Sequence, residues 1–122
     1  MATKDTTGVS GGSGSSLTSA SVTVGSNGNR ILDIAVVLSS NTATVSSVTR
    51  NGQSATQIQR VALVDTSIEV WRIIAPTTGA ATITASFSTS VGEAYVAWYS
   101  VYNVNQTTPS SATQTQSSAS WI

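Results

Sequence analysis

The chain has 122 residues, with five basic and five acidic side chains, no Cys and no His. This length predicts one domain. Charged residues make up 8% of the chain, against about 25% in an average soluble domain, while Ser (22) and Thr (19) fill a third of the positions. The usual zinc ligands, a Cys nucleophile and a His base are therefore excluded. Zero net charge with five scattered cations excludes the dense basic surface that nucleic-acid binding needs. The composition favours a binding or structural module over an enzyme.

Residues 1–16 are rich in Gly, Ser and Thr and end in the run Gly11-Gly12-Ser13-Gly14-Ser15-Ser16. Such a segment is a flexible coil when free, because it has little apolar surface to bury. We expect either a linker or an arm that lies extended on a neighbouring subunit. The first residues do not form a basic-then-apolar signal, so we expect either release without a cleaved leader or a sequence given without its leader, and the initiating Met1 favours the first. No apolar run approaches the ~18–20 residues that cross a bilayer.

From residue 17 onward the sequence predicts β-strands. Runs rich in Val, Ile and Thr alternate with turn residues, and no window of 11 or more residues combines a helical period with a helix-favouring composition. The expected strands span residues 17–24, 30–38, 44–50, 53–64, 68–75, 81–87 and 93–104. Seven or eight short strands predict an all-β, antiparallel β-sandwich of the jelly-roll or immunoglobulin-like kind. The sandwich domain is expected at 17–108, between an arm at 1–16 and a C-terminal arm or strand at 109–122.

Three local signals shape this prediction. Asn51-Gly52 between two strands is the strongest short hairpin signal. Residues 30–38 are apolar on both faces apart from Asp33, so this strand is expected to be central and covered on each side by another layer or subunit. A turn at 88–92 is expected to separate the last two strands.

Three stretches of the chain resemble a known family. They are Ser46–Thr56, Ile68–Pro76 with the following 79–84, and Val101–Pro109. In this order they resemble a jelly-roll-like β-sandwich module of phage virion proteins and large bacterial surface proteins. Its pattern is a TxxGQALT hairpin, a VExWYL strand, a GTxTVTVTFS strand and a YSGVDQTTP close. The chain departs from this pattern at Arg72, in place of Tyr, and at Asn103, in place of Gly. The resemblance implies a fold and a setting, and it brings no catalytic residues.

The acidic residues predict structure rather than chemistry. They are Asp5, Asp33, Asp65, Glu69 and Glu93. Their spacing pairs no two of them for glycosidase chemistry and gives no EF-hand-like set of calcium ligands. Asp33 stands inside an apolar strand, where a carboxylate is costly unless paired. We expect it to form an ion pair or hydrogen bond with Arg72 or Arg30, and we predict no catalytic residue, cofactor or metal.

Aromatic side chains are the remaining binding candidates. Five of them, Trp71, Tyr95, Trp98, Tyr99 and Tyr102, cluster on two predicted strands. Trp98 and Tyr102 share one face of their strand, and Tyr95 and Tyr99 share the other. One face is expected to be core, and the other exposed or at an interface. Core packing, contact between subunits and stacking on a sugar stay open as roles for Trp71 and Trp98.

Trp121 and Ile122 follow a polar stretch, and we expect these large apolar groups to dock on the domain or on a neighbouring molecule. Together with the arms, they favour a non-enzymatic structural protein of a phage virion. It would be a capsid decoration (cement) protein or another head or tail component, a homo-oligomer that assembles with other capsid proteins through sheet edges and terminal arms. The alternative is a carbohydrate-binding or adhesion module of a bacterial surface protein, with a glycan as partner. Nucleic acid and membrane are not expected partners.

Overall fold

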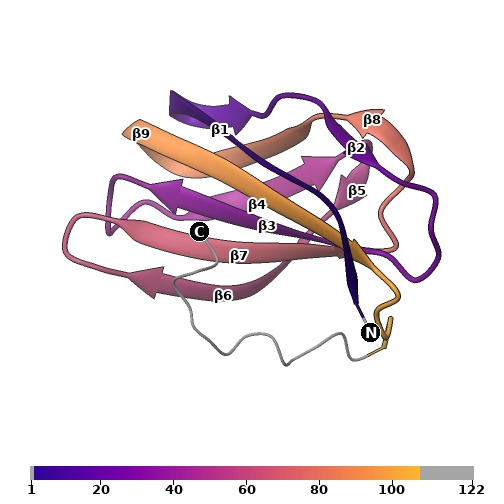
Figure 1. Cartoon of the computed structure of the whole chain (residues 1–122). Coiled ribbons are helices and arrows are strands. Elements are labelled where there is room, and N and C mark those ends of the chain that lie inside the picture. The colour runs from indigo at the N-terminus through magenta and orange to yellow at the C-terminus, as the bar shows by residue number, and fades with distance from the viewer. Residues whose placement is uncertain (1, 108–122) are drawn as a thin grey trace.

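The computed structural model describes residues 2–107, and within them every regular element is a strand (Figure 1). The strands are β1 (Thr3–Thr18), β2 (Val22–Val24), β3 (Ile31–Leu38), β4 (Val45–Arg50), β5 (Gln53–Ser54), β6 (Thr56–Ala62), β7 (Ser67–Ile74), β8 (Gly79–Ala81) and β9 (Ile83–Tyr102). All pair antiparallel. The predicted all-β, sandwich-like fold is therefore confirmed. The arm or strand expected at 109–122 lies outside the described residues.

β9 organises the sheet because two different strands pair with its two parts. Residues 83–87 of β9 pair with β4, and residues 94–101 pair with β3. The seven-stranded sheet runs β5-β4-β9-β3-β7-β6, with β1 also paired to β9. It curls into a half-barrel, as Figure 1 shows. β2 and β8 form a separate two-stranded sheet.

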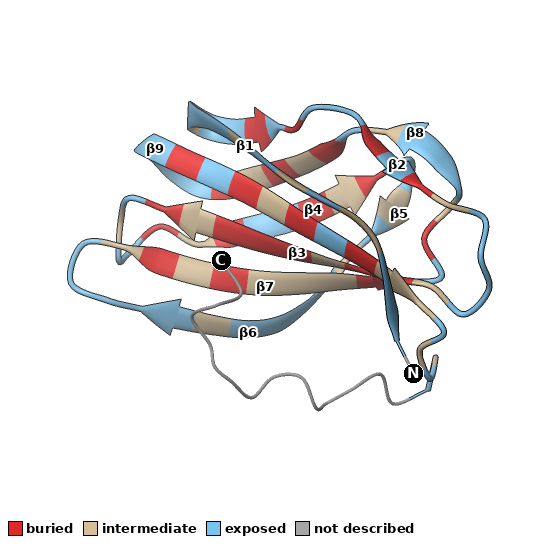
Figure 2. Cartoon of the chain, viewed as in Figure 1, coloured by how far each residue is buried: buried red, intermediate tan, exposed pale blue. Residues whose placement is uncertain are grey.

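The core lies inside this curl and draws on both parts of the sheet. Its side chains include Leu32, Ile34, Val36 and Leu38 from β3, Val45 and Val48 from β4, Ile83, Phe87, Val96 and Trp98 from β9, and Val22 and Val24 from β2. Each fully buried aliphatic side chain contributes about 1.5–3 kcal/mol. Buried and exposed residues alternate along much of β9 (Figure 2). β3 lies between β9 and β7, which confirms the predicted central strand.

Two long strands differ from the predicted elements. Residues 1–16 are expected as an arm outside the sandwich, but residues 3–18 form β1, which pairs with β9 along its length. This segment is ordered by its backbone hydrogen bonds, which need few apolar side chains. The turn expected at 88–92 is also wrong, because β9 continues through it. Register shifts on both sides of Gly14, whose φ is 109°, let β1 follow β9 through the curl.

The hairpin predicted at Asn51-Gly52 joins β4 to β5 and is confirmed. Arg50 pairs with Gln53 across it. Asn51 and Gly52 have φ values of 50° and 80°, which are the positive values that a two-residue type I′ turn needs at both central positions.

Arg50, the last residue of β4, is buried in the core. Its guanidinium donates hydrogen bonds to the carbonyl oxygens of Thr77 at 2.9 Å, Val22 at 2.9 Å and Gly79 at 2.7 Å. Burial lowers the pKa of this guanidinium from its ordinary value, because the charged form loses contact with water. Arg50 thereby fastens the small β2–β8 sheet to the end of β4.

Candidate functional site: an exposed sheet face

The side of β1, β9, β3 and β7 that points away from the core forms four cross-strand rows, which we call the outer face. The rows are Lys4, Val101, Ile31 and Ile74; Thr7, Tyr99, Asp33 and Arg72; Val9, Ala97, Ala35 and Val70; and Gly11, Tyr95, Val37 and Ile68. Successive strand residues alternate between the two sides of a sheet. The outer face is therefore the reverse of the surface that presents Leu32, Ile34 and Val36 to the core.

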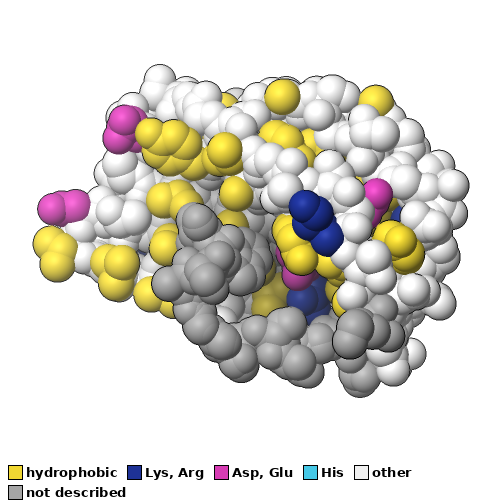
Figure 3. All heavy atoms as spheres, in the orientation of Figure 1, with side chains coloured by type: hydrophobic (Ala, Val, Ile, Leu, Met, Phe, Trp, Pro, Cys, Tyr) yellow, Lys and Arg dark blue, Asp and Glu magenta, His cyan; other side chains and the backbone are white. Residues whose placement is uncertain are grey.

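Large apolar side chains on and beside the outer face are open to solvent. They are Val9, Tyr95, Tyr99 and Ile74 on the face, and Val61, Leu63 and Val64 on the adjoining β6–β7 hairpin. Val9 is 63% exposed, Tyr95 44% and Tyr99 40%. Figure 3 shows hydrophobic side chains gathered over this side of the molecule. Contiguous exposed apolar surface marks an interaction site, because scattered single residues would be the norm on a solvent-facing sheet.

The centre of the outer face carries an ion pair between Asp33 and Arg72. Arg72 Nε lies 2.6 Å from Asp33 Oδ1, and Arg72 Nη2 donates to Asp33 Oδ2 at 3.0 Å. This two-point contact confirms the ion pair predicted from the sequence. Arg30, the other predicted partner, donates instead to the carbonyl oxygen of Pro76. Because the two charges cancel, the middle of the face has no net charge.

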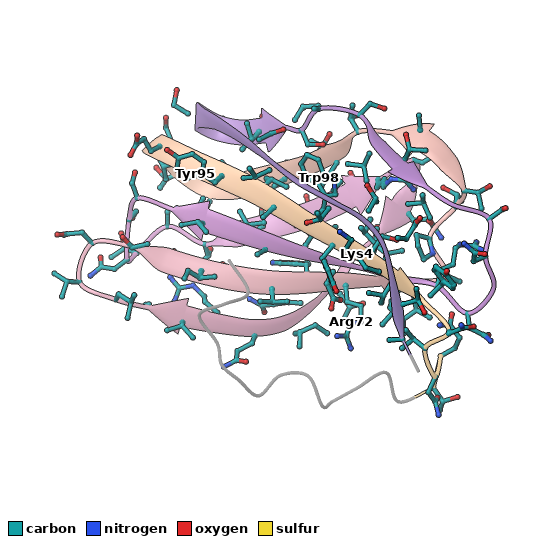
Figure 4. All side chains as sticks on the ribbon, in the orientation of Figure 1. Lys4, Arg72, Tyr95 and Trp98 are labelled. Atoms are coloured by element: carbon teal, nitrogen blue, oxygen red, sulfur yellow. The ribbon has the colours of Figure 1, made fainter. Side chains whose placement is uncertain are left out.

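The other charges of this side stand at opposite ends of the layer. Lys4 is in the first row, where β9 ends, and it is exposed. Glu93 is also exposed, and it lies two residues before Tyr95, on the same side of β9. Figure 4 shows Lys4 and Tyr95 far apart along the layer. The outer face therefore has a positive end and a negative end, separated by apolar rows.

The aromatic residues divide between the two sides of the sheet as predicted. Trp98 is buried in the core, and Trp71 is partly buried and packs against it. Tyr95 and Tyr99 are exposed on the outer face, and Tyr102 is partly buried. Both tryptophans therefore pack in or against the core of this chain. Tyr95 and Tyr99 remain as the aromatic groups that are open to a partner.

Two glycines of β1 leave room for the rings of Trp98 and Tyr95. A Cβ at Gly8 would collide with the Trp98 ring on the core side, and a Cβ at Gly11 would meet the Tyr95 ring at 2.8 Å on the outer face. Each ring therefore lies over the backbone of β1, where a larger residue would displace it. In the sequence, the glycines of residues 1–16 suggest a flexible arm. In the structure, two of them are positions where rings of β9 pack against the backbone of β1.

Glu69 is a buried polar centre that the sequence did not single out. Its carboxylate accepts hydrogen bonds from the amide of Val45 and the side chain of Gln57, both at 2.8 Å, and from Trp71 Nε1 at 3.1 Å. Arg60 Nε lies 3.4 Å from it. The sequence contains one sign of this burial, since alternation along β7 puts Glu69 on the same side of the strand as Trp71. These partners satisfy the carboxylate, so its role is to connect β4, β6 and β7.

The described residues offer little that resembles a reaction centre. Within residues 2–107, no group of three His, Cys, Asp or Glu side chains could hold a metal ion, and no helix is present that could span a membrane. An open hollow just after β9 is lined by Asn29, Asn103, Val104, Asn105 and Gln106. Its amides can form hydrogen bonds, but none of these lining side chains titrates.

Trp121 and Ile122, the other two predicted contact residues, lie outside the described residues. No family model, no curated protein and no solved structure matches the chain. Its function is therefore inferred from its own residues, above all from the outer face.

Proposed function

We propose that this protein is a non-enzymatic structural component of a phage virion, a capsid decoration protein or another head or tail component, which works by binding other protein surfaces. The observation that carries the proposal is the outer face, whose apolar rows expose Val9, Tyr95 and Ile74 around an internally neutralised ion pair. A sheet face of this kind can be covered by another protein without burying an unpaired charge. Copies of the same chain and other capsid proteins are the proposed partners.

The outer face supports assembly better than the sheet edges do. β5 is only two residues long, and β6 has a register shift between Gln57 and Gln59. Short and bulged edges resist pairing with a further strand. β1 pairs with β9 along one of its edges, so it is not a free arm, and its other edge is interrupted by the register shifts between Lys4 and Thr6 and on both sides of Gly14. Assembly through the face therefore replaces assembly through the edges in our proposal.

The virion setting is supported by the resemblance of the stretches Ser46–Thr56, Ile68–Pro76 and Val101–Pro109 to a module of phage virion proteins. A low charge content agrees with this setting, since near-zero net charge lowers the repulsion between copies packed in an array.

Peptide mass spectrometry of gradient-purified particles from a phage that encodes this chain tests the proposal. We expect the chain in the particle fraction at a fixed ratio to the major capsid protein. Recovery of the chain only in the cell-envelope or soluble fraction, from preparations whose particles are intact, would overturn the virion role.

A carbohydrate-binding module is the second candidate, favoured by one observation. Tyr95 and Tyr99 expose their rings on the same side of β9, and exposed aromatic rings can stack on sugars. A glycan array with the wild-type chain, Tyr99→Ala and the control Tyr102→Phe would separate the two functions. Binding by the wild type and the control that is lost in a folded Tyr99→Ala variant would favour this second function.

A further inference from the structure

We propose that two copies of this chain pack through their outer faces with their strands antiparallel, so that Lys4 of each copy faces Glu93 of the other. This inference deepens the proposed function, on which it rests, by naming the first partner of the assembling surface.

The apolar rows favour a second sheet as the occupant. Sheets stack face to face at about 10 Å through interdigitating side chains. The outer face offers such side chains from neighbouring strands, with Val9 on β1, Tyr95 and Tyr99 on β9, and Ile74 on β7. A second copy presents the same set, and a two-fold axis lets both copies bury it at once.

The end charges select between the two possible two-fold arrangements. An axis along the strands would keep both Lys4 residues at one end of the interface and both Glu93 residues at the other end, so neither charge would meet an opposite charge. An axis across the strands, within the interface, reverses one copy and places each Lys4 over the Glu93 end of its partner. The same reversal brings the exposed hairpin residues Leu63 and Val64 toward the end of β7 that exposes Ile74. Exposed ion pairs add little affinity, but like charges placed together oppose an arrangement, so the charges set the orientation.

Charge also favours a second copy over the chain's own residues 108–122. That segment contains no Asp, Glu, Lys or Arg. It therefore offers no charged side chain to either Lys4 or Glu93, whereas an antiparallel second copy offers one to each.

Cross-linking tests the orientation, because the wild-type chain has no Cys. The variants Lys4→Cys and Glu93→Cys, carried on chains with tags of different mass, are mixed under mild oxidation. We expect the mixed Lys4→Cys/Glu93→Cys product to exceed both homodimeric products. The control Thr23→Cys, on an exposed residue of β2, should form little disulfide with either. Dominant homodimeric products would overturn the antiparallel arrangement.

Sedimentation equilibrium of the full chain tests the dimer itself. Lys4→Glu and Glu93→Lys each place two like-charged pairs in the interface, so we expect each to raise the dissociation constant by about tenfold or more. The double variant Lys4→Glu/Glu93→Lys should recover the wild-type value within about twofold. Val9→Glu should give a monomer with an unchanged circular dichroism spectrum, and the control Thr23→Glu should leave the dimer intact.

One result would overturn the dimer. A wild-type chain that stays monomeric at all concentrations refutes it, and if Trp121→Ser/Ile122→Ser then dimerises, residues 108–122 are the occupant instead. In either case, recovery of the chain in phage particles would leave the proposed function standing. A dimer from a chain that particles lack would refute the virion role alone.

Discussion

At the scale of the residue, buried charge is tolerated only where the fold supplies partners for it. Glu69 is buried but receives donors from β4, β6 and β7 itself, so the cost of removing it from water is offset. The buried guanidinium of Arg50 also has partners, because it donates hydrogen bonds to backbone carbonyl oxygens. Both side chains connect segments that are distant in the chain. Their hydrogen-bond partners give both side chains a role in holding these segments together.

Glu69→Ala should destabilise the protein by about 3 kcal/mol, because the donors of Gln57, Trp71 and Val45 lose their acceptor and Arg60 its counter-charge. The free energy of unfolding in urea measures this. The matched control is Glu93→Ala, an exposed acid whose loss should change that free energy by less than about 0.5 kcal/mol at a concentration where the chain is monomeric. Equal losses in the two variants would contradict the structural role of Glu69.

At the scale of the element, β1 and β9 act as a single unit. Thr7 donates its hydroxyl to the carbonyl of Trp98, 91 residues away in the chain, at 3.0 Å. Asp5 makes a second connection between the two strands, because its carboxylate accepts a hydrogen bond from the hydroxyl of Ser100 at 3.1 Å. It also accepts one from the amide of Gly25 at 2.8 Å. Glycine at positions 8 and 11 lets the rings of β9 lie over β1.

Gly8→Ala should cost about 1–3 kcal/mol of stability, because the added methyl group collides with the buried Trp98 ring. Chemical unfolding followed by Trp fluorescence measures the loss. The control Gly28→Ala adds a methyl group where no neighbouring atom lies within 4 Å, and it should be neutral within about 0.5 kcal/mol. A Gly8→Ala variant as stable as this control would show that the ring and the strand are not in contact.

At the scale of the whole molecule, the two sides of one layer have different roles. The inner side holds the core, and the outer side combines partly exposed apolar rows with a central ion pair and oppositely charged ends. A protein built in this way has a closed core and also a surface whose burial by a partner is favourable.

The melting temperature should therefore rise with protein concentration, because association stabilises the folded chain and not the unfolded one. Differential scanning calorimetry over a hundredfold concentration range measures the rise. Val9→Glu should melt at one temperature throughout that range. A wild-type melting temperature that does not depend on concentration would argue against self-association.

Local patterns in the sequence determined the strand content, the Asn51-Gly52 hairpin and the two sides of the aromatic strand, on which Trp98 and Tyr95 fall. These features depend on turn chemistry and on a period of two, which act between near neighbours. The need of Asp33 for a cationic partner could be predicted for a related reason, since an acid in an apolar strand must be paired.

Tertiary structure alone decided that residues 3–18 are a strand, that β9 runs unbroken through 88–92, and that Glu69 is buried among donors. Each of these depends on contacts between segments far apart in the chain, and a Gly- and Ser-rich stretch carries no local sign of the strand that will pair with it. The exposure of Tyr95 and Tyr99 was decided in the same way. Alternation assigns them to one side of β9, but only the packed layers determine which side becomes the core.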